Sequence, residues 1–292
     1  MIQRRQFGIA TAFSLVPTLA AFPTNTWGKA GESPFHEQMA ALESAAQARL
    51  GVYLIDTATG RTFGHRADER FLMLSSFKLL ASALVLARAD KGQESLQRRI
   101  RYTREDLVTW SPVTEKHVGG EGLTLAQLCE ATITTSDNTA ANLILASYGG
   151  PAALTAFARS LGDTVTRLDR TEPELNVPSG AAMLDTTTPR AMTHTLQKLL
   201  VGNALSEASR RTLLQWLKAN TTGDKRLRAG VPAGWVVGEK TGTNRSDAND
   251  IGIAWPPGRA PWLVSAYLAD SAAPPAAREA AIAGVGRLLA AL

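Results

Sequence analysis

The feature that most constrains the fold is the segment from Phe71 to Asp90, which has the pattern of a buried helix. From Phe77 to Ala89 its apolar residues fall on every side of the 3.6-residue helical repeat. A helix that is apolar all round is normally buried. We therefore expect this helix to run through the middle of the core, with the other elements packed around it.

Two polar residues, Ser75 and Lys78, stand three positions apart at the start of this helix. On a helix that spacing puts two side chains on the same face, one turn apart. The first turn also offers unpaired backbone N–H groups and a partial positive charge, which favour an ionising serine or an oxyanion. The pair predicts a nucleophile, although a serine at a helix start more often serves only as a cap.

Length and composition indicate an ordinary globular protein. The 292 residues suffice for one large domain or two smaller ones. The net charge of +5 is mildly basic, but the basic residues are scattered among 26 acidic ones and accompany no nucleic-acid-binding motif, so we expect no nucleic-acid partner. Cys129 is the only cysteine, and its apolar helical surroundings indicate a buried structural residue without a disulfide.

Residues 1–30 differ from the rest and predict a signal peptide. A pair of arginines precedes an uncharged run from Gly8 to Phe22, which is shorter than the roughly 20 residues needed to span a bilayer. This layout is typical of secretory signals, and the paired arginines resemble a twin-arginine signal. We expect cleavage after Ala20 or as late as Ala30, and a periplasmic or secreted protein without membrane contact.

Sequence periodicity places strands at both ends of the mature chain and helices between them. Helical patterns and capping signals predict helices over 35–50, 71–90, two stretches within 124–150, 151–161, 189–200, 206–220 and 276–292. Alternating patterns between turn residues predict strands over 52–56, 61–63, 235–242, 251–255 and 262–268. The economical fold is α+β: a five-stranded antiparallel sheet flanked by the N- and C-terminal helices, an α/β sandwich, plus an inserted all-α domain.

The predicted domain organisation follows from this order of elements. Residues 31–70 and 221–292 are expected to form a discontinuous α/β domain, and residues 71–220 the all-helical domain. The latter includes a long loop, 167–185, which is rich in proline, glycine and polar residues. Loops of this length tend to be functional. We expect the active site at the interface between the two domains.

Four groups of residues are specific when they are taken together. They are Ser75-x-x-Lys78, Ser136-Asp137-Asn138, the loop segment from Arg170 to Asn176, and Lys240-Thr241-Gly242 on a predicted strand. In this order and at these separations they resemble the class A serine β-lactamases. The resemblance covers the whole mature chain and implies a secreted enzyme that hydrolyses the β-lactam amide of penicillins and cephalosporins.

The resemblance also implies a role for each catalytic residue. Ser75 would be the nucleophile, and either Lys78 or Glu172 would accept its proton, a choice that the sequence leaves open. Ser136 would pass a proton to the departing ring nitrogen. Backbone N–H groups of Ser75 and Thr243 would receive the oxyanion. Glu172 would hold the water that releases the acyl-enzyme.

Further residues are implied in binding and support. Asn176 would hold the water together with Glu172, and Asn138 would keep Lys78 and the substrate in register. Trp110 would line the mouth of the cleft, and Arg170 and Asp185 would clamp the loop whose Glu172–Pro173 bond is expected to be cis. The wall facing the substrate carboxylate would be formed by Lys240, Thr241, Gly242, Thr243 and Arg226. Arg226 is the least specific member, because many relatives supply this arginine from the next strand.

Other functions were weighed against this interpretation. A penicillin-binding D,D-peptidase or acyl-sensor would acylate without rapid release, and Glu172 with Asn176 favours the hydrolase. A zinc-dependent lactamase is disfavoured because the four histidines form no His-x-His pair. A non-catalytic binding module is the least specific alternative. We expect a monomer that acts on small-molecule β-lactams without a metal or cofactor.

Overall fold

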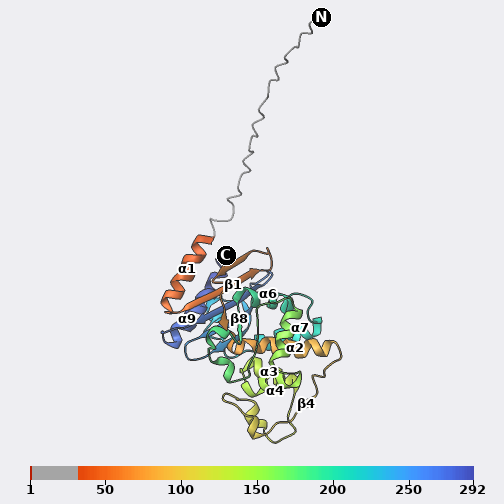
Figure 1. Cartoon of the computed structure of the whole chain (residues 1–292). Coiled ribbons are helices and arrows are strands. Elements are labelled where there is room, and N and C mark those ends of the chain that lie inside the picture. The colour runs from red at the N-terminus through yellow and green to blue at the C-terminus, as the bar shows by residue number, and fades with distance from the viewer. Residues whose placement is uncertain (2–31) are drawn as a thin grey trace.

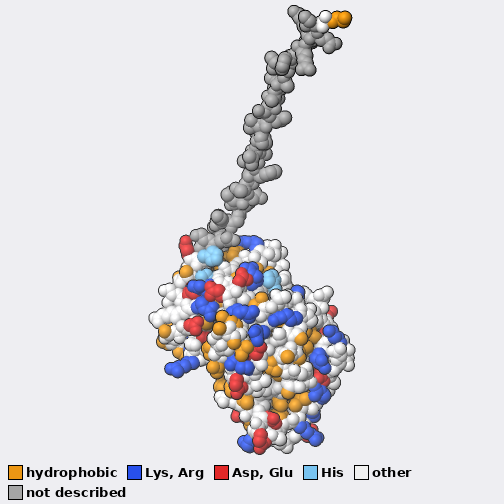
Figure 2. Space-filling model, in the orientation of Figure 1, with side chains coloured by type: hydrophobic (Ala, Val, Ile, Leu, Met, Phe, Trp, Pro, Cys, Tyr) orange, Lys and Arg blue, Asp and Glu red, His pale blue; other side chains and the backbone are white. Residues whose placement is uncertain are grey.

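The computed structural model describes Met1 and residues 32–292, so the predicted signal peptide lies, apart from Met1, outside the described residues. A sheet separates two layers of helices (Figure 1). On the face shown in Figure 2, basic and acidic side chains are interspersed, as the sequence predicts. No helix in the described part of the chain has the length and apolar character needed to cross a bilayer.

The sheet contains five strands in the order β2-β1-β9-β8-β7, and every neighbouring pair is antiparallel. Their bounds are β1 Arg49–Asp56, β2 Thr62–His65, β7 Val236–Thr243, β8 Ala248–Trp255 and β9 Trp262–Ala269. Because β1 pairs with β9 along its full length, the first and last strands of the chain lie side by side. The predicted α+β fold with a five-stranded antiparallel sheet is confirmed.

Side-chain alternation gives the sheet two buried faces. Leu50, Val52 and Leu54 of β1 belong to a core with helices α1 and α9, whereas Tyr53 and Ile55 belong to a larger core with the other helices. Successive strand residues point to opposite faces, so one strand can serve both cores. The outer helices are α1 Glu32–Ala45 and α9 Pro275–Leu288.

The helix α2 Phe77–Asp90 crosses the larger core, as predicted, with every residue from Phe77 to Ala87 buried. The helices that follow it along the chain are α3 Leu125–Thr134, α4 Asn138–Ser147, α5 Pro151–Ser160, α6 Pro189–Leu200, α7 Glu207–Lys218 and α8 Leu227–Gly230. The short strands are β3 Phe71–Leu72, β4 Arg99–Ile100, β5 Leu123–Thr124 and β6 Thr186–Thr187. The 3-10 helices are η1 Leu74–Ser76, η2 Arg104–Asp106, η3 Thr114–His117, η4 Glu174–Asn176 and η5 Gly180–Ala182.

Two predicted helix boundaries were wrong. The first helix ends at Ala45, and Arg49 and Leu50 belong to β1, because Leu50 packs into the outer core of the sheet. The central helix begins at Phe77, so Ser75, which was expected at its start, lies just before it. Phe71 and Leu72, from the same apolar segment, form β3, which pairs with β6. Such pairing with a distant segment leaves no signal in local periodicity.

The predicted domain division stays a prediction. The larger core joins Tyr53 and Tyr267 of the sheet to Leu80 and Leu128 of the helices without interruption. The helices and the face of the sheet that they cover therefore share one hydrophobic core, and this core does not mark a domain boundary between them.

Candidate active site

Ser75 lies in the 3-10 helix η1, immediately before α2 and not in its first turn. Leu74 has a positive φ of 48°, so the chain turns sharply just before the serine. The strand β7 passes close by at Gly242, where an added Cβ would lie 2.8 Å from the Cβ of Leu74. Glycine at this position lets the strand approach the turn that carries Ser75.

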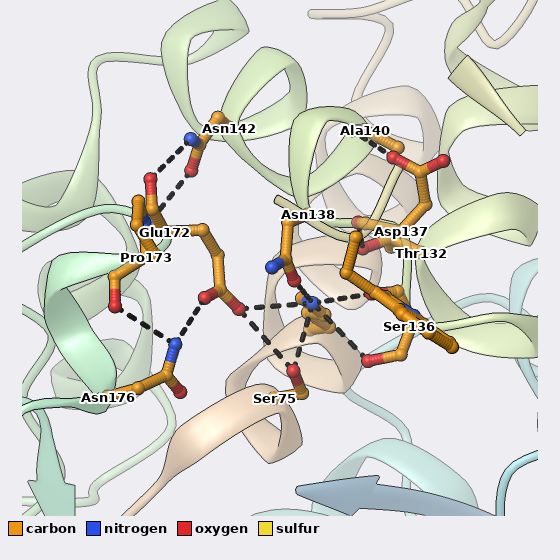
Figure 3. Close-up of polar contacts among 12 residues, drawn as sticks. Ser75, Thr132, Ser136, Asp137, Asn138, Ala140, Asn142, Glu172, Pro173 and Asn176 are labelled. Atoms are coloured by element: carbon orange, nitrogen blue, oxygen red, sulfur yellow. Dashed lines mark hydrogen bonds and ion pairs between the residues drawn. The ribbon is translucent and has the colours of Figure 1, made fainter. Parts of the chain in front are cut away.

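Ser75, Ser136, Asn138 and Glu172 point toward one another (Figure 3). The ammonium of Lys78 contacts all four. Its Nζ donates to Ser75 Oγ at 2.9 Å and lies 3.0 Å from Glu172 Oε1. It also donates to Ser136 O at 2.8 Å, to Ser136 Oγ at 3.3 Å and to Asn138 Oδ1 at 2.5 Å. One buried amine thus touches four predicted site residues that come from three separate parts of the chain.

Burial of Lys78 lowers the pKa of its ammonium more than the nearby carboxylates raise it. The side chain is fully buried, and burial lowers the pKa of its ammonium, while the Glu172 and Asp137 carboxylates raise it. Desolvation disfavours the charged form of a lysine, whereas a nearby carboxylate favours it. The amine is thereby brought closer to proton exchange than a solvated lysine.

Glu172 is buried and held from several sides. Its Oε1 accepts from Ser75 Oγ at 3.4 Å, and its Oε2 accepts from Asn176 Nδ2 at 2.6 Å. Its backbone N–H and C=O both bond the side chain of Asn142, at 2.9 and 2.8 Å. The peptide bond between Glu172 and Pro173 is cis, as predicted.

The loop that carries Glu172 is tied at its neck by the predicted ion pair. Arg170 Nε donates to Asp185 Oδ2 at 2.6 Å, and Arg170 Nη2 donates to Val177 O at 2.7 Å. The fully buried Asp185 also accepts the backbone N–H groups of Asp169 and Arg170 through Oδ1. These bonds join the two ends of the loop close to Glu172.

Ser136 has a positive φ of 60° and presents its hydroxyl between two ammonium groups. Lys240 Nζ donates to Ser136 Oγ at 3.1 Å and to Thr241 O at 2.8 Å. Burial, reinforced by the positive charges of Lys78 and Arg226, holds the pKa of Lys240 well below its ordinary value. Three cations close together in a dry site favour binding of an anion.

A cavity of about 400 Å³ opens in front of these groups. Its lining consists of Ser75, Trp110, Ser136, Asn138, Glu172, Asn176, Thr222, Thr241, Gly242 and Thr243. Trp110 is 62% exposed at the rim and anchored by Nε1, which donates to Thr135 O at 3.0 Å. The structure thus brings most of the predicted site residues around one hollow.

Arg226 and Lys240, both predicted members of the carboxylate-binding wall, do not line the cavity themselves. The guanidinium of Arg226 is buried behind β7. It donates to Thr243 Oγ1 at 2.6 Å, to Gly242 O at 2.9 Å and to Asn249 O at 2.7 Å. Arg226 thus joins the predicted wall through Thr243, and its role in binding the substrate carboxylate stays a prediction.

Three residues that the sequence reasoning gave no role also shape the site. Asn142 stands one helical turn beyond Asn138 on α4, a spacing that could have indicated a shared face. Thr222 lines the cavity and its Oγ1 lies 2.5 Å from Thr241 Oγ1, a contact without a local sequence signal. Asp137 is buried and caps α4 through Ala140 N at 2.8 Å.

Asp137 also fixes the loop beside the cavity. Its carboxylate accepts the backbone N–H groups of Val113 and Thr114 and the hydroxyl of Thr114. We expect Asp137→Ala to lower the free energy of unfolding by about 3 kcal/mol, because several buried donors lose their acceptor. Urea unfolding measures this value. Asp68→Ala, which removes an exposed ion pair with Arg190, should cost about 0.5 kcal/mol or less, and equal losses would contradict the prediction.

Comparison with known proteins agrees with this geometry. Residues 34–292 match the β-lactamase enzyme family. The chain is 48% identical to a β-lactamase of Streptomyces albus G, over 90% of this chain and 86% of the relative, and 46% identical to β-lactamase L2 of Stenotrophomonas maltophilia, over 99% and 98%. Among solved structures, the ancestral GNCA class A β-lactamase superposes with a TM-score of 0.86 at 61% identity, covering 88% of this chain and 98% of that chain.

A second structure, the putative class A β-lactamase PenP of Rhodopseudomonas palustris, gives the same TM-score of 0.86 at 57% identity, covering 88% of this chain and 99% of that chain. Fold, site and relatives define a hydrolase of β-lactams. The chain belongs to the β-lactamase enzyme family, in its class A.

Proposed function

We propose that this enzyme hydrolyses penicillins and cephalosporins through an acyl-enzyme formed on Ser75. The observation that carries the proposal is the contact of the Ser75 hydroxyl with both an amine and a carboxylate, Lys78 at 2.9 Å and Glu172 at 3.4 Å. A serine hydroxyl is a weak nucleophile unless a base stands beside it. Both partners needed for activation are within reach in a buried setting.

Proton removal from Ser75 is proposed to begin with Glu172. In the ion pair, the Lys78 ammonium donates its hydrogens and has no lone pair, so it cannot accept a proton. The Glu172 carboxylate can accept one, either from Ser75 or first from Lys78, whose Nζ lies 3.0 Å from its Oε1. In the second route the neutral amine then takes the proton of Ser75. The lowered pKa of Lys78 supports this exchange.

The departing ring nitrogen is proposed to receive its proton from Ser136. Lys78 and Lys240 both donate to Ser136 Oγ, so this oxygen is filled as an acceptor and its own hydrogen is free to point elsewhere. The oxyanion that forms during attack is assigned to backbone N–H groups of Ser75 and Thr243. This assignment draws on the close approach of β7 to η1 at Gly242.

Release of the acyl group is assigned to Glu172 with Asn176. The Asn176 amide fixes one carboxylate oxygen at 2.6 Å, and the clamp between Arg170 and Asp185 restrains the loop. A carboxylate held in this way can position and deprotonate a water at the acyl ester. The alternative, a penicillin-binding D,D-peptidase or acyl-sensor, would not need such a carboxylate.

The substrate carboxylate is proposed to bind at the hydroxyls of Thr241 and Thr243. Lys240 and Arg226 lie behind them and supply positive charge without exposure to water. Asn138 and Trp110 are assigned to the substrate's other edge.

The test is to quench a reaction with benzylpenicillin within milliseconds and map the adduct by peptide mass spectrometry. We expect the added mass on the peptide that contains Ser75, together with continued turnover. An adduct on another residue, or a stoichiometric burst without turnover, would refute the proposed mechanism.

We propose further that the enzyme is exported and works as a monomer in the periplasm or outside the cell. The support is the basic start and short apolar run of residues 1–30. N-terminal sequencing of the protein from a periplasmic extract should give a first residue between positions 21 and 31. An unprocessed N-terminus would contradict export.

A further inference from the structure

Two buried carboxyl groups lie behind the active-site strand. Glu239 of β7 and Asp250 of β8 are both 0% exposed. In the register of the two strands, Glu239 is opposite Gly252 and Asp250 is opposite Thr241, so the acids are diagonal neighbours on one face. Gly252 places no side chain between them.

These acids lack the donors that buried carboxylates normally have. Asp250 Oδ2 accepts from Leu227 N at 3.1 Å, but no donor of the described chain hydrogen-bonds Asp250 Oδ1 or either oxygen of Glu239. Arg228 Nη2 lies 3.1 Å from Glu239 Oε1 as an ion pair only. Gly223 covers Glu239 closely, since a Cβ there would lie 2.0 Å from Oε1.

Asp163 shows how a buried carboxylate is satisfied elsewhere in this protein. Its Oδ1 accepts from the N–H groups of Val165 and Thr166, and its Oδ2 accepts from the hydroxyls of Thr166 and Thr195. The missing donors at Glu239 and Asp250 are therefore a local feature that requires its own explanation.

One proton supplies the missing donor. Asp250 and Glu239 are diagonal neighbours with unpartnered buried oxygens, so a proton held by one acid is a donor for the other, whereas two ionised carboxylates have no hydrogen to share. Burial, together with the charge of Glu239, raises the pKa of Asp250 well above its ordinary value. Two carboxyl groups that share a site cannot both ionise easily.

The acid pair faces the guanidinium that supports the substrate wall. Strand alternation puts Glu239, Thr241 and Thr243 on one face of β7, where Arg226 donates to Thr243 Oγ1, and Lys240 on the other face. The charged groups that act on the pair are Arg226, Arg228 and Lys240, and Arg278 and Glu279 act on Arg226. Asp250 and Glu239 are both among the carboxylates whose charge favours the buried Arg226 cation.

We propose that Glu239 and Asp250 share one proton in the folded enzyme and act together as positioning residues for Arg226, which in turn orients Thr243. The positioning half rests on the proposed function, because it takes the Thr243 hydroxyl to be part of the carboxylate-binding wall. The proton-sharing half does not depend on any substrate.

The proton is tested by unfolding, without substrate. Above about pH 5 the unfolded chain has both acids ionised, whereas the native pair keeps one proton. Stability therefore falls as pH rises, by up to about tenfold per pH unit in the unfolding equilibrium constant. Asp250→Asn offers Glu239 a fixed N–H donor and removes the proton. The unfolding equilibrium constant of Asp250→Asn should therefore fall relative to that of wild type by up to about tenfold for each pH unit. Urea unfolding between about pH 5.5 and pH 7.5 measures this.

Asp163→Asn is the matched control for loss of a buried carboxylate, and it should keep the wild-type dependence on pH. If Asp250→Asn follows the same pH dependence as wild type, the shared proton is refuted. This outcome would leave the acyl-enzyme proposal untouched, since adduct formation on Ser75 is measured separately.

Positioning is tested by separating KM from kcat for benzylpenicillin. Asp250→Ala removes both the proton and the bond to Leu227, so we expect KM to rise about tenfold while kcat changes by less than about threefold. Asp250→Asn should restore KM to within about threefold of wild type. Should Asp250→Ala not fold, Glu239→Ala breaks the same pair from the other side. An unchanged KM in the alanine variant, or equal loss in the alanine and asparagine variants, would refute the positioning role.

Discussion

Replacing Ser75 by alanine is expected to lower kcat for benzylpenicillin by about 10⁶-fold, because it removes the hydroxyl that contacts both Lys78 and Glu172. The fold should persist, since Lys78 keeps its contacts with Ser136, Asn138 and Glu172. Steady-state kinetics on protein with an unchanged circular dichroism spectrum measures the effect. Retention of more than about one per cent of the activity would place the nucleophile elsewhere.

The neighbouring Ser76 is the matched control. Its hydroxyl donates to Met73 O at 2.7 Å and contacts Tyr267 OH at 3.2 Å, so it points into the core and away from the cavity. Ser76→Ala should cost about 1 kcal/mol of stability through the lost hydrogen bonds. Hydrolysis by this variant should stay close to the wild-type rate.

Replacing Glu172 by alanine is expected to lower kcat about 10³-fold and to trap the acyl-enzyme. The carboxylate is the group proposed to activate the releasing water. Without it the pKa of Lys78 falls, so the neutral amine can take the proton of Ser75 and the adduct still forms. Intact-protein mass spectrometry after mixing with benzylpenicillin should show a long-lived added mass. A variant that releases the product as fast as wild type would contradict the assignment.

Glu172→Gln adds a test of pH dependence. Without the carboxylate, one cause that raises the pKa of Lys78 is lost, while burial still lowers it. The Lys78 pKa should fall further, so its neutral amine becomes available at lower pH. Acylation of Glu172→Gln should therefore speed up as pH rises through that pKa, as stopped-flow measurements would detect. Glu174→Gln is the control, because Glu174 is exposed on the same loop and should behave as wild type.

The sequence alone predicted those helices and turns whose capping residues, turn residues or hydrophobic period lie within the element itself. The helix from Pro189 to Leu200 has the predicted bounds, since proline at its first position and the capping Thr188 mark its start. The turn between β1 and β2 and the buried central helix were likewise readable from period and turn residues. The candidate catalytic residues came from motifs whose order and spacing match a known family.

Only the tertiary structure decided how distant segments meet. The amine of Lys78 contacts Ser75, Ser136 and Glu172. Lys240 in turn contacts the hydroxyl of Ser136. These residues come from different parts of the chain. Arg226 reaches Thr243 from behind β7, and the position of α8 decides the side from which it does so.

The acid pair behind β7 illustrates the same limit. Glu239 and Asp250 stand eleven positions apart on two strands, and no local pattern indicates that they touch. Their contact depends on the register of β7 with β8 and on burial by the segment around Gly223. Periodicity and caps act over a few residues and can be read along the chain. Register, burial and shared protons depend on the whole packed molecule.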